Sequence, residues 1–209
     1  MTPLKFDIIK FWVRTRNNLT KLNYFLGVCF VSTECVQSWI NAYDTSQGDA
    51  TLTFLEGSNN FHLEFRNHFK PTNPDDWVIL TRPQLDWYTN TKGCVRTNIK
   101  CPAGSLVLWD SRTIHCGKEP DSSRPQPNFR CAVYLCYTPR KLGNSSELNK
   151  KIEAWENMRT TSHCPHKPKL FPVNPNTWGK PIPNIVQIPR PQISDLGYRL
   201  IGYETKPQE

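Results

Sequence analysis

Short apolar or alternating stretches, separated by turn-forming residues, fill most of the chain between residues 35 and 137. Two stand out: residues 105–109 (SLVLW) follow a Pro-Ala-Gly turn, and residues 130–137 (RCAVYLCY) are rich in strand-forming Val, Tyr and Leu. The pattern predicts two strands, the first of them buried, joined by a polar loop that contains three prolines. His115 follows the first strand and Arg130 opens the second, so we expect both to face the same interior space.

Weaker patterns predict further strands upstream. Alternation favours strands over residues 34–43 and 50–55 with a turn between them, and a shorter strand over residues 94–99. Residues 60–69 carry a Phe at every fourth position, which is typical of one face of a short helix. The predicted fold is therefore mainly β: a double-stranded β-helix, that is, a jelly-roll or cupin-like antiparallel sandwich with a short helical insert.

The first 33 residues differ from this core. They mix basic and apolar residues; the apolar run 24–31 predicts a buried strand, and the shorter IIKFWV is a candidate strand. The run is too short to cross a bilayer, and no small-x-small cleavage site follows it. A signal or anchor sequence and a poorly folded segment remain alternatives.

The C-terminal third predicts one helix and a proline-rich tail. Asn144 and Glu147 have the spacing of a capping box, and an apolar face follows over residues 145–159, made by Leu148, Ile152, Trp155 and Met158. The remainder of the chain is rich in proline and predicts little regular structure. We therefore divide the chain into residues 1–33, 34–140 and 141–209.

Charge and cysteine content limit the possible partners and the cellular compartment only slightly. The formal charge of +8 suits an anionic partner, but the basic residues are scattered, so we expect a small-molecule or acidic substrate, no membrane, and no nucleic acid. None of the eight cysteines has CxxC spacing, and several lie in predicted strands. The interpretation is free thiols in a reducing compartment, which predicts a cytoplasmic location.

Residues Gly104 to His115 (GSLVLWDSRTIH), followed by Arg130, resemble the second half of an Fe(II)/2-oxoglutarate dioxygenase of the phytanoyl-CoA dioxygenase-like family. The resemblance extends from about residue 35 to residue 139. It implies that His115 is a catalytic iron ligand and that Arg130 binds the far carboxylate of 2-oxoglutarate. It also implies that Trp39 forms a wall of the cofactor pocket. The implied activity is hydroxylation of a C–H bond, with Fe(II) and 2-oxoglutarate as cofactors.

One part of the family pattern is missing. A facial triad needs two histidines and a carboxylate, and the family supplies two of these as His-x-Asp before the tryptophan, yet the first histidine of this chain is His62. A replaced or truncated N-terminal segment, other ligands, and a wrong alignment are three explanations. We predict weak or absent Fe(II) binding; the alternative function is that of a non-catalytic jelly-roll binding or structural protein derived from the family.

Two histidine clusters are weak substitutes for the missing ligands. His62 and Glu64 fall in the predicted helix, where residues two apart point about 200° from each other. The His163–His166 cluster contains a cysteine but lacks the partner ligands of a zinc site. A packing or surface role is the more ordinary interpretation of both.

Overall fold

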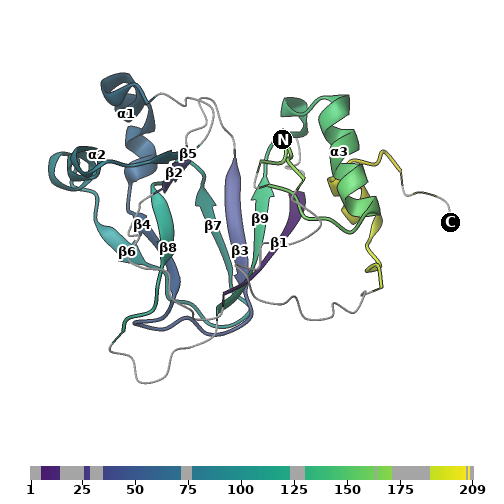
Figure 1. Cartoon of the computed structure of the whole chain (residues 1–209), viewed down its shortest axis with the longest axis horizontal. Coiled ribbons are helices and arrows are strands. Elements are labelled where there is room, and N and C mark those ends of the chain that lie inside the picture. The colour runs from purple at the N-terminus through teal and green to yellow at the C-terminus, as the bar shows by residue number, and fades with distance from the viewer. Residues whose placement is uncertain are drawn as a thin grey trace, which may run out of the picture. The chain divides into compact units, whose positions relative to one another are not determined.

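The computed structural model describes residues 6–14, 26–28, 35–71, 77–122, 130–162, 164–170, 189–205 and 207; for residues 6–14, 26–28 and 77 it describes the backbone only (Figure 1). The chain separates into two compact units, which are described one at a time: Phe11–Tyr134, and Met1–Lys10 with Leu135–Glu209. The described strands are β1 (Phe6–Arg14), β2 (Leu26–Val28), β3 (Val36–Asn41), β4 (Thr51–Leu55), β5 (Trp77–Ile79), β6 (Arg96–Asn98), β7 (Leu106–Asp110), β8 (His115–Lys118) and β9 (Arg130–Tyr137). The helices are α1 (His62–Phe69), α2 (Arg82–Asp86), α3 (Ser145–Glu156) and α4 (Asp195–Ile201), with helical turns η1 (Ser58–Phe61), η2 (Trp87–Thr91) and η3 (Arg140–Leu142).

The strands form two sheets with a nested order. One sheet has the order β1-β9-β3-β7 and the other β5-β2-β8-β4-β6 (Figure 1). The first strand therefore neighbours the last, β2 pairs with β8, β3 with β7 and β4 with β6, the last three pairs being antiparallel. The prediction of a mainly β fold with antiparallel sheets and few helices is confirmed.

The five-stranded sheet buries both of its faces. On one face Leu52 of β4 packs against Trp39 of β3 and Ala132 of β9, so this cluster lies between the two sheets. The opposite face carries Leu55 and Cys116, which pack against residues of α1 and η2. The alternation of β4 explains the division, because successive residues of a strand point to opposite faces.

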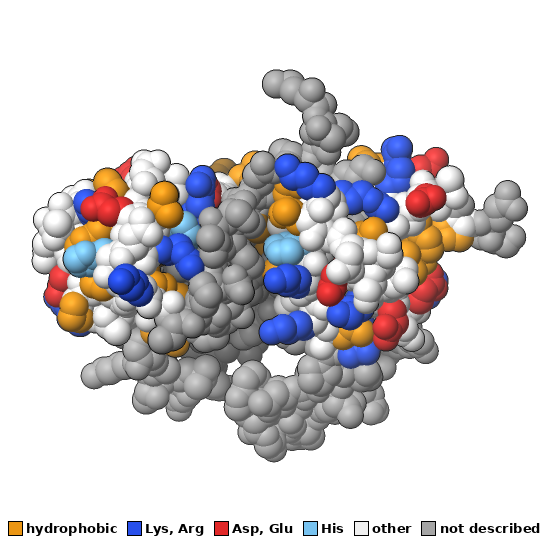
Figure 2. Space-filling view, turned by 90° about the horizontal axis from the view of Figure 1, so that it is seen from above, with side chains coloured by type: hydrophobic (Ala, Val, Ile, Leu, Met, Phe, Trp, Pro, Cys, Tyr) orange, Lys and Arg blue, Asp and Glu red, His pale blue; other side chains and the backbone are white. Residues whose placement is uncertain are grey.

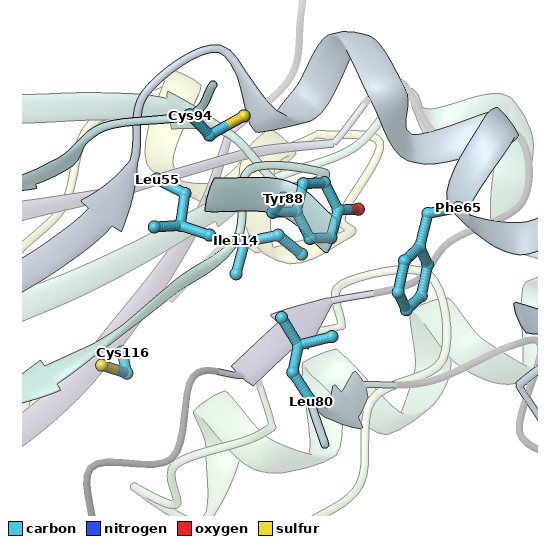
Figure 3. Packing of buried hydrophobic residues seen from close by; sticks show 7 residues of the cluster. All are labelled: Leu55, Phe65, Leu80, Tyr88, Cys94, Ile114 and Cys116. Atoms are coloured by element: carbon cyan, nitrogen blue, oxygen red, sulfur yellow. The ribbon is translucent and has the colours of Figure 1, made fainter. Parts of the chain in front are cut away.

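The cluster on the helical side is apolar and closely packed. It comprises seven buried residues: Leu55, Phe65, Leu80, Tyr88, Cys94, Ile114 and Cys116 (Figure 3). The Phe65 ring stacks on Tyr88, with ring centroids 5.3 Å apart, and Phe69 lies 5.0 Å from Phe65. The predicted phenylalanine face of α1 is thus the face that closes this cluster.

The prediction of strand β7 is confirmed, but the prediction that it is buried is wrong. The strand forms where the sequence predicts it, but it is not buried: Leu106 is 51% exposed and Leu108 is 55% exposed. These residues alternate with Val107 and Trp109, which pack against the cluster between the sheets. A continuous apolar run does not reveal which alternate residues face the core, and β7 stands at the end of its sheet.

The N-terminal strand predictions fall partly on described residues. β1 and β2 are strands, as IIKFWV and the apolar run predict, while their burial lies outside the description. None of the described helices is long and apolar enough to span a bilayer. The seven cysteines within the described residues are free thiols, as predicted.

The C-terminal prediction is partly confirmed. The Asn144 side chain accepts a hydrogen bond of 3.0 Å from the backbone N–H of Glu147 and so caps α3. Trp155 packs edge-on against Tyr198, with ring centroids 6.2 Å apart. The helix ends at Glu156, and Met158 is exposed with a φ of 51°, so the prediction that Met158 extends the apolar face is wrong.

The sequence predicts little regular structure in the C-terminal tail, and helix α4 corrects this prediction. Ser194 caps this helix by accepting a hydrogen bond from the Gly197 N–H, and Leu200 is buried. Prolines dominate the composition of the tail, but residues 194–201 contain none, and a short capped helix fits between them. The proline-rich stretch 171–188 lies outside the described residues.

Candidate functional site

The strand registers place His115 and Arg130 on the inner faces of the two sheets. His115 is directly opposite Phe54 in the β4–β8 ladder and therefore shares the face of Leu52. Arg130 shares its face with Ala132 and Tyr134, since residues two apart in a strand point the same way. Both faces border the cluster between the sheets.

A row of aromatic rings lies between these two residues. The His115 ring is edge-on to Trp109, with centroids 5.4 Å apart. Trp109 packs against the cluster that contains Trp39, and its Nε1 donates a 2.9 Å hydrogen bond to Gln37. The interior is thus built from indole rings with polar groups among them.

The Arg130 guanidinium is held by aromatic contacts. Its Cζ lies 4.4 Å from the centre of the Trp39 ring and 5.6 Å from the centre of the Tyr134 ring. Arg130 Nη2 donates a 2.6 Å hydrogen bond to the Tyr134 hydroxyl. Among the described residues, no carboxylate pairs with this half-buried cation. A guanidinium in this state is suited to an anionic ligand.

A recess that is open to solvent adjoins the guanidinium; it is lined by Trp39, Asn41, Tyr43, Asp44, Thr45, Asp49, Ala50, Arg130 and Cys131. Two buried polar atoms of this lining, Trp39 Nε1 and Asn41 Oδ1, find no hydrogen-bond partner among the described residues. An unpaired buried donor or acceptor is costly, by about 1–3 kcal/mol, unless a ligand or water satisfies it. The indole donor beside Arg130 suits a carboxylate, while the Asn41 acceptor suits a hydroxyl or a water molecule.

The imidazole of His115 is oriented by the backbone. Its Nδ1 lies 2.7 Å from the carbonyl oxygen of Thr113. Because a carbonyl only accepts hydrogen bonds, Nδ1 carries the proton in this contact and the lone pair resides on Nε2. Histidines that bind metals are commonly held in this way.

The described residues do not complete an iron centre around His115. No group of three His, Cys, Asp or Glu side chains that could hold a metal exists within the described ranges. Leu26 is the residue opposite His115 in the β2–β8 ladder, and β2 reads Leu-Gly-Val, none of which is a metal-ligating type. The donor set therefore does not fit a facial triad, which needs a second imidazole and a carboxylate.

The substitute clusters do not supply the missing ligands. His62 is buried, whereas Glu64 is exposed and forms a 2.5 Å ion pair with Lys92, so the two side chains serve different surroundings. Cys164 Sγ lies 3.9 Å from His166, without a third ligand among the described residues, and His163 lies outside them.

One carboxylate near the end of β7 has a shifted pKa. Burial raises the pKa of Asp110, but hydrogen bonds from the Arg112 side chain and backbone, with the charges of Arg112 and His62, outweigh it and hold the pKa below its ordinary value. Asp110 is therefore committed to Arg112, whose guanidinium contacts both of its oxygens.

Sequence reasoning missed Tyr134 and Asn41 as parts of the site. Tyr134 lies four residues after Arg130 in the same strand, so the period of two could have indicated that they share a face. No comparable signal exists for Asn41, because its neighbours in the recess come from the turn at residues 43–50.

Comparisons with known proteins give partial similarities. No known family profile matches the chain. The curated Ava biosynthesis cluster protein O of Aspergillus versicolor is 28% identical over 143 residues, which are 64% of this chain and 44% of that protein. The chain thus spans less than half the length of this curated relative.

Similar solved structures include non-heme α-ketoglutarate-dependent enzymes. EvdMO1 is 15% identical with a TM-score of 0.45, covering 66% of this chain and 28% of its own. The carbocyclase SnoK from nogalamycin biosynthesis is 18% identical with a TM-score of 0.35, over 54% and 39%. The epimerase SnoN, solved with Fe³⁺, α-ketoglutarate and nogalamycin RO, is 20% identical with a TM-score of 0.36, over 64% and 53%.

Proposed function

We propose that the chain has the double-stranded β-helix of the phytanoyl-CoA dioxygenase-like Fe(II)/2-oxoglutarate dioxygenases, and that Arg130 binds the far carboxylate of 2-oxoglutarate. The observation that carries this proposal is the guanidinium of Arg130, stacked on Trp39 and without a carboxylate partner among the described residues. The nested strand order supports the fold, since a jelly roll pairs its strands from the outside inwards.

The chemistry of the recess supports a carboxylate. The planar guanidinium can donate two parallel hydrogen bonds, and the bond to the Tyr134 hydroxyl holds it in one orientation. The unpaired Trp39 Nε1 supplies a further donor at the same end of the recess. These contacts would bind and orient the ligand.

Hydroxylation requires more than these residues supply. The described residues offer His115 with its Nε2 lone pair but no second imidazole and no carboxylate to complete the triad. We therefore assign the described residues a binding role and derive no iron-dependent step from them. This same observation favours the second candidate function, a non-catalytic jelly roll that retains the carboxylate site.

Calorimetric titration with 2-oxoglutarate and with glutarate tests the binding role. We expect saturable binding of both ligands that is strongly weakened in Arg130→Gln and unchanged in Arg82→Gln. Arg82 is the matched control because it is an exposed arginine of the same unit, paired with Asp86. Equal affinity of Arg130→Gln and the unsubstituted chain would refute the carboxylate site.

Added Fe(II) separates the two candidate functions. Glutarate lacks the 2-oxo group, so a bound metal should tighten 2-oxoglutarate but not glutarate. For the described donor set we expect no tightening and no succinate production above that of His115→Ala. Robust succinate production that is lost in His115→Ala would instead establish a dioxygenase with ligands outside the described residues.

A further inference from the structure

A second recess lies within the unit formed by the C-terminal residues. It opens to solvent and is lined by Thr138, Pro139, Arg140, Gly143, Leu148, Lys151, Pro165, His166, Arg199 and Leu200. Its basic residues come from three separate elements, η3, α3 and α4, and from the turn at His166. Figure 2 shows that Lys and Arg side chains are numerous on the face of the molecule that is seen from above.

The charges of this lining all have one sign. Arg140, Lys151 and Arg199 are permanent cations, and the lining contains no Asp or Glu. Among the described residues, neither Arg140 nor Arg199 has a carboxylate partner. Three cations around one recess repel one another, and a bound anion would remove that repulsion.

Lys151 is held in place by a backbone contact. Its Nζ donates a 2.9 Å hydrogen bond to the carbonyl oxygen of Leu200, which ties α3 to α4 at the wall of the recess. Glu147 acts on His166 and forms its own 3.3 Å ion pair with Lys150. The lining of the recess contains no carboxylate that could pair with Arg140 or Arg199.

The shape of the recess indicates the kind of anion. Three of its lining residues, Pro139, Leu148 and the buried Leu200, are apolar and are called the apolar floor below, and the buried Thr138 also belongs to the lining. Two guanidinium groups suit the oxygens of a phosphate, which offers more acceptors and more charge than a carboxylate. An apolar floor adds affinity for an organic group attached to that phosphate.

We propose that this recess binds the phosphate group of a small organic phosphate ester. The site is formed by residues other than those of the Arg130 recess, so the proposal does not depend on 2-oxoglutarate binding. Free inorganic phosphate shares the charged part of the interaction and should bind more weakly, because it does not cover the apolar floor.

Titration calorimetry of the full chain with phenyl phosphate and with inorganic phosphate at fixed ionic strength tests the proposal. We expect saturable binding, tighter for phenyl phosphate, and a loss of about tenfold or more in Arg140→Gln and in Arg199→Gln. Lys169→Gln is the matched control, since Lys169 is an exposed lysine of the same unit that lies outside the lining of the recess, and this variant should retain the affinity. Arg130→Gln should also bind phenyl phosphate normally.

Three results would overturn the proposal: no saturable binding, the same loss in Lys169→Gln as in Arg140→Gln, or equal affinity for benzoate and phenyl phosphate. The circular dichroism spectrum of each variant verifies that it is folded. If Arg199→Gln does not fold, Arg140→Gln decides, because Arg140 lies in a short helical turn outside the α3–α4 contact.

Discussion

The two faces of the five-stranded sheet differ in the polarity of the side chains packed against them. The face toward the helices is covered by a cluster of seven apolar and thiol side chains around Phe65 and Tyr88. The opposite face meets the other sheet, where the Arg130 guanidinium lies over Trp39, and where the buried Trp39 Nε1 and Asn41 Oδ1 have no hydrogen-bond partner among the described residues. The first arrangement contributes stability, and the second places unsatisfied groups where a ligand can reach them.

This difference teaches where substitutions should separate stability from binding. A truncated side chain in the apolar cluster leaves a cavity. A substitution between the sheets instead changes which polar groups are available to bind a ligand. The two classes of variant should therefore have distinct signatures in denaturation and in ligand titration.

The largest effect is expected from Phe65→Ala. Phe65 is 1% exposed and stacks on Tyr88, so its truncation should lower the free energy of unfolding by about 3–5 kcal/mol. Urea denaturation measures this, with Leu63→Ala as the control, because Leu63 is on the same helix and 67% exposed. The folded fraction should keep its affinity for 2-oxoglutarate; equal destabilisation by both variants would contradict the assignment of the core.

Arg130→Gln should show the opposite signature. The affinity for 2-oxoglutarate should fall by about 10- to 100-fold, which corresponds to the loss of hydrogen bonds from a charged donor. The loss of stability should be only about 1 kcal/mol, because the contact with Trp39 is a cation–π interaction. Arg130→Lys should recover only part of the affinity, since lysine keeps the positive charge but cannot donate the two parallel hydrogen bonds of a guanidinium.

Trp39→Phe probes the unpaired indole donor. The unliganded chain should lose about 1 kcal/mol or less, because the substitution keeps a large ring and removes a buried N–H that has no partner. The affinity for 2-oxoglutarate should fall by about fivefold to tenfold, as expected for one hydrogen bond. If stability falls while affinity is unchanged, Trp39 is a core residue and no part of the binding site.

Asp110→Asn should give the smallest effect and a pH signature. The pKa of Asp110 in the folded chain lies below its ordinary value of 3.8. The carboxylate therefore stabilises the fold above that value, and the contribution is lost as the pH falls through the folded pKa. The pair with Arg112 is partly exposed, so we expect the substitution to lower the free energy of unfolding by about 1 kcal/mol or less. When stability is measured against pH, the variant should lose less stability than the unsubstituted chain as the pH falls.

The sequence predicted the strands well and the surroundings of the site poorly. Arg130–Tyr137 and Val36–Asn41 are strands because Val, Ile, Tyr and Trp alternate there with residues of the other face. The exposure of Leu106 and Leu108 could not be predicted, since it depends on β7 lying at the end of the sheet order. The contribution of Asn41 likewise depends on a turn that approaches β3 only in the folded chain.

The roles of His115, Arg130 and Trp39 stay predictions, although the register brings them to one interior space. Local pattern is sufficient to align a histidine and an arginine on two strands, because strand alternation is a local property. The completeness of a metal centre is not local, since its ligands come from strands distant in the sequence.

Burial raises the pKa of the Cys116 thiol to about 11 and raises that of Cys94 as well. Both thiols lie in the cluster on the helical side (Figure 3) and are almost fully protonated at neutral pH, while the thiolate is the reactive form. An alkylating reagent can therefore consume them only in the moments when that cluster opens. The rate at which the two thiols are modified in native buffer would therefore measure how often this cluster unfolds locally.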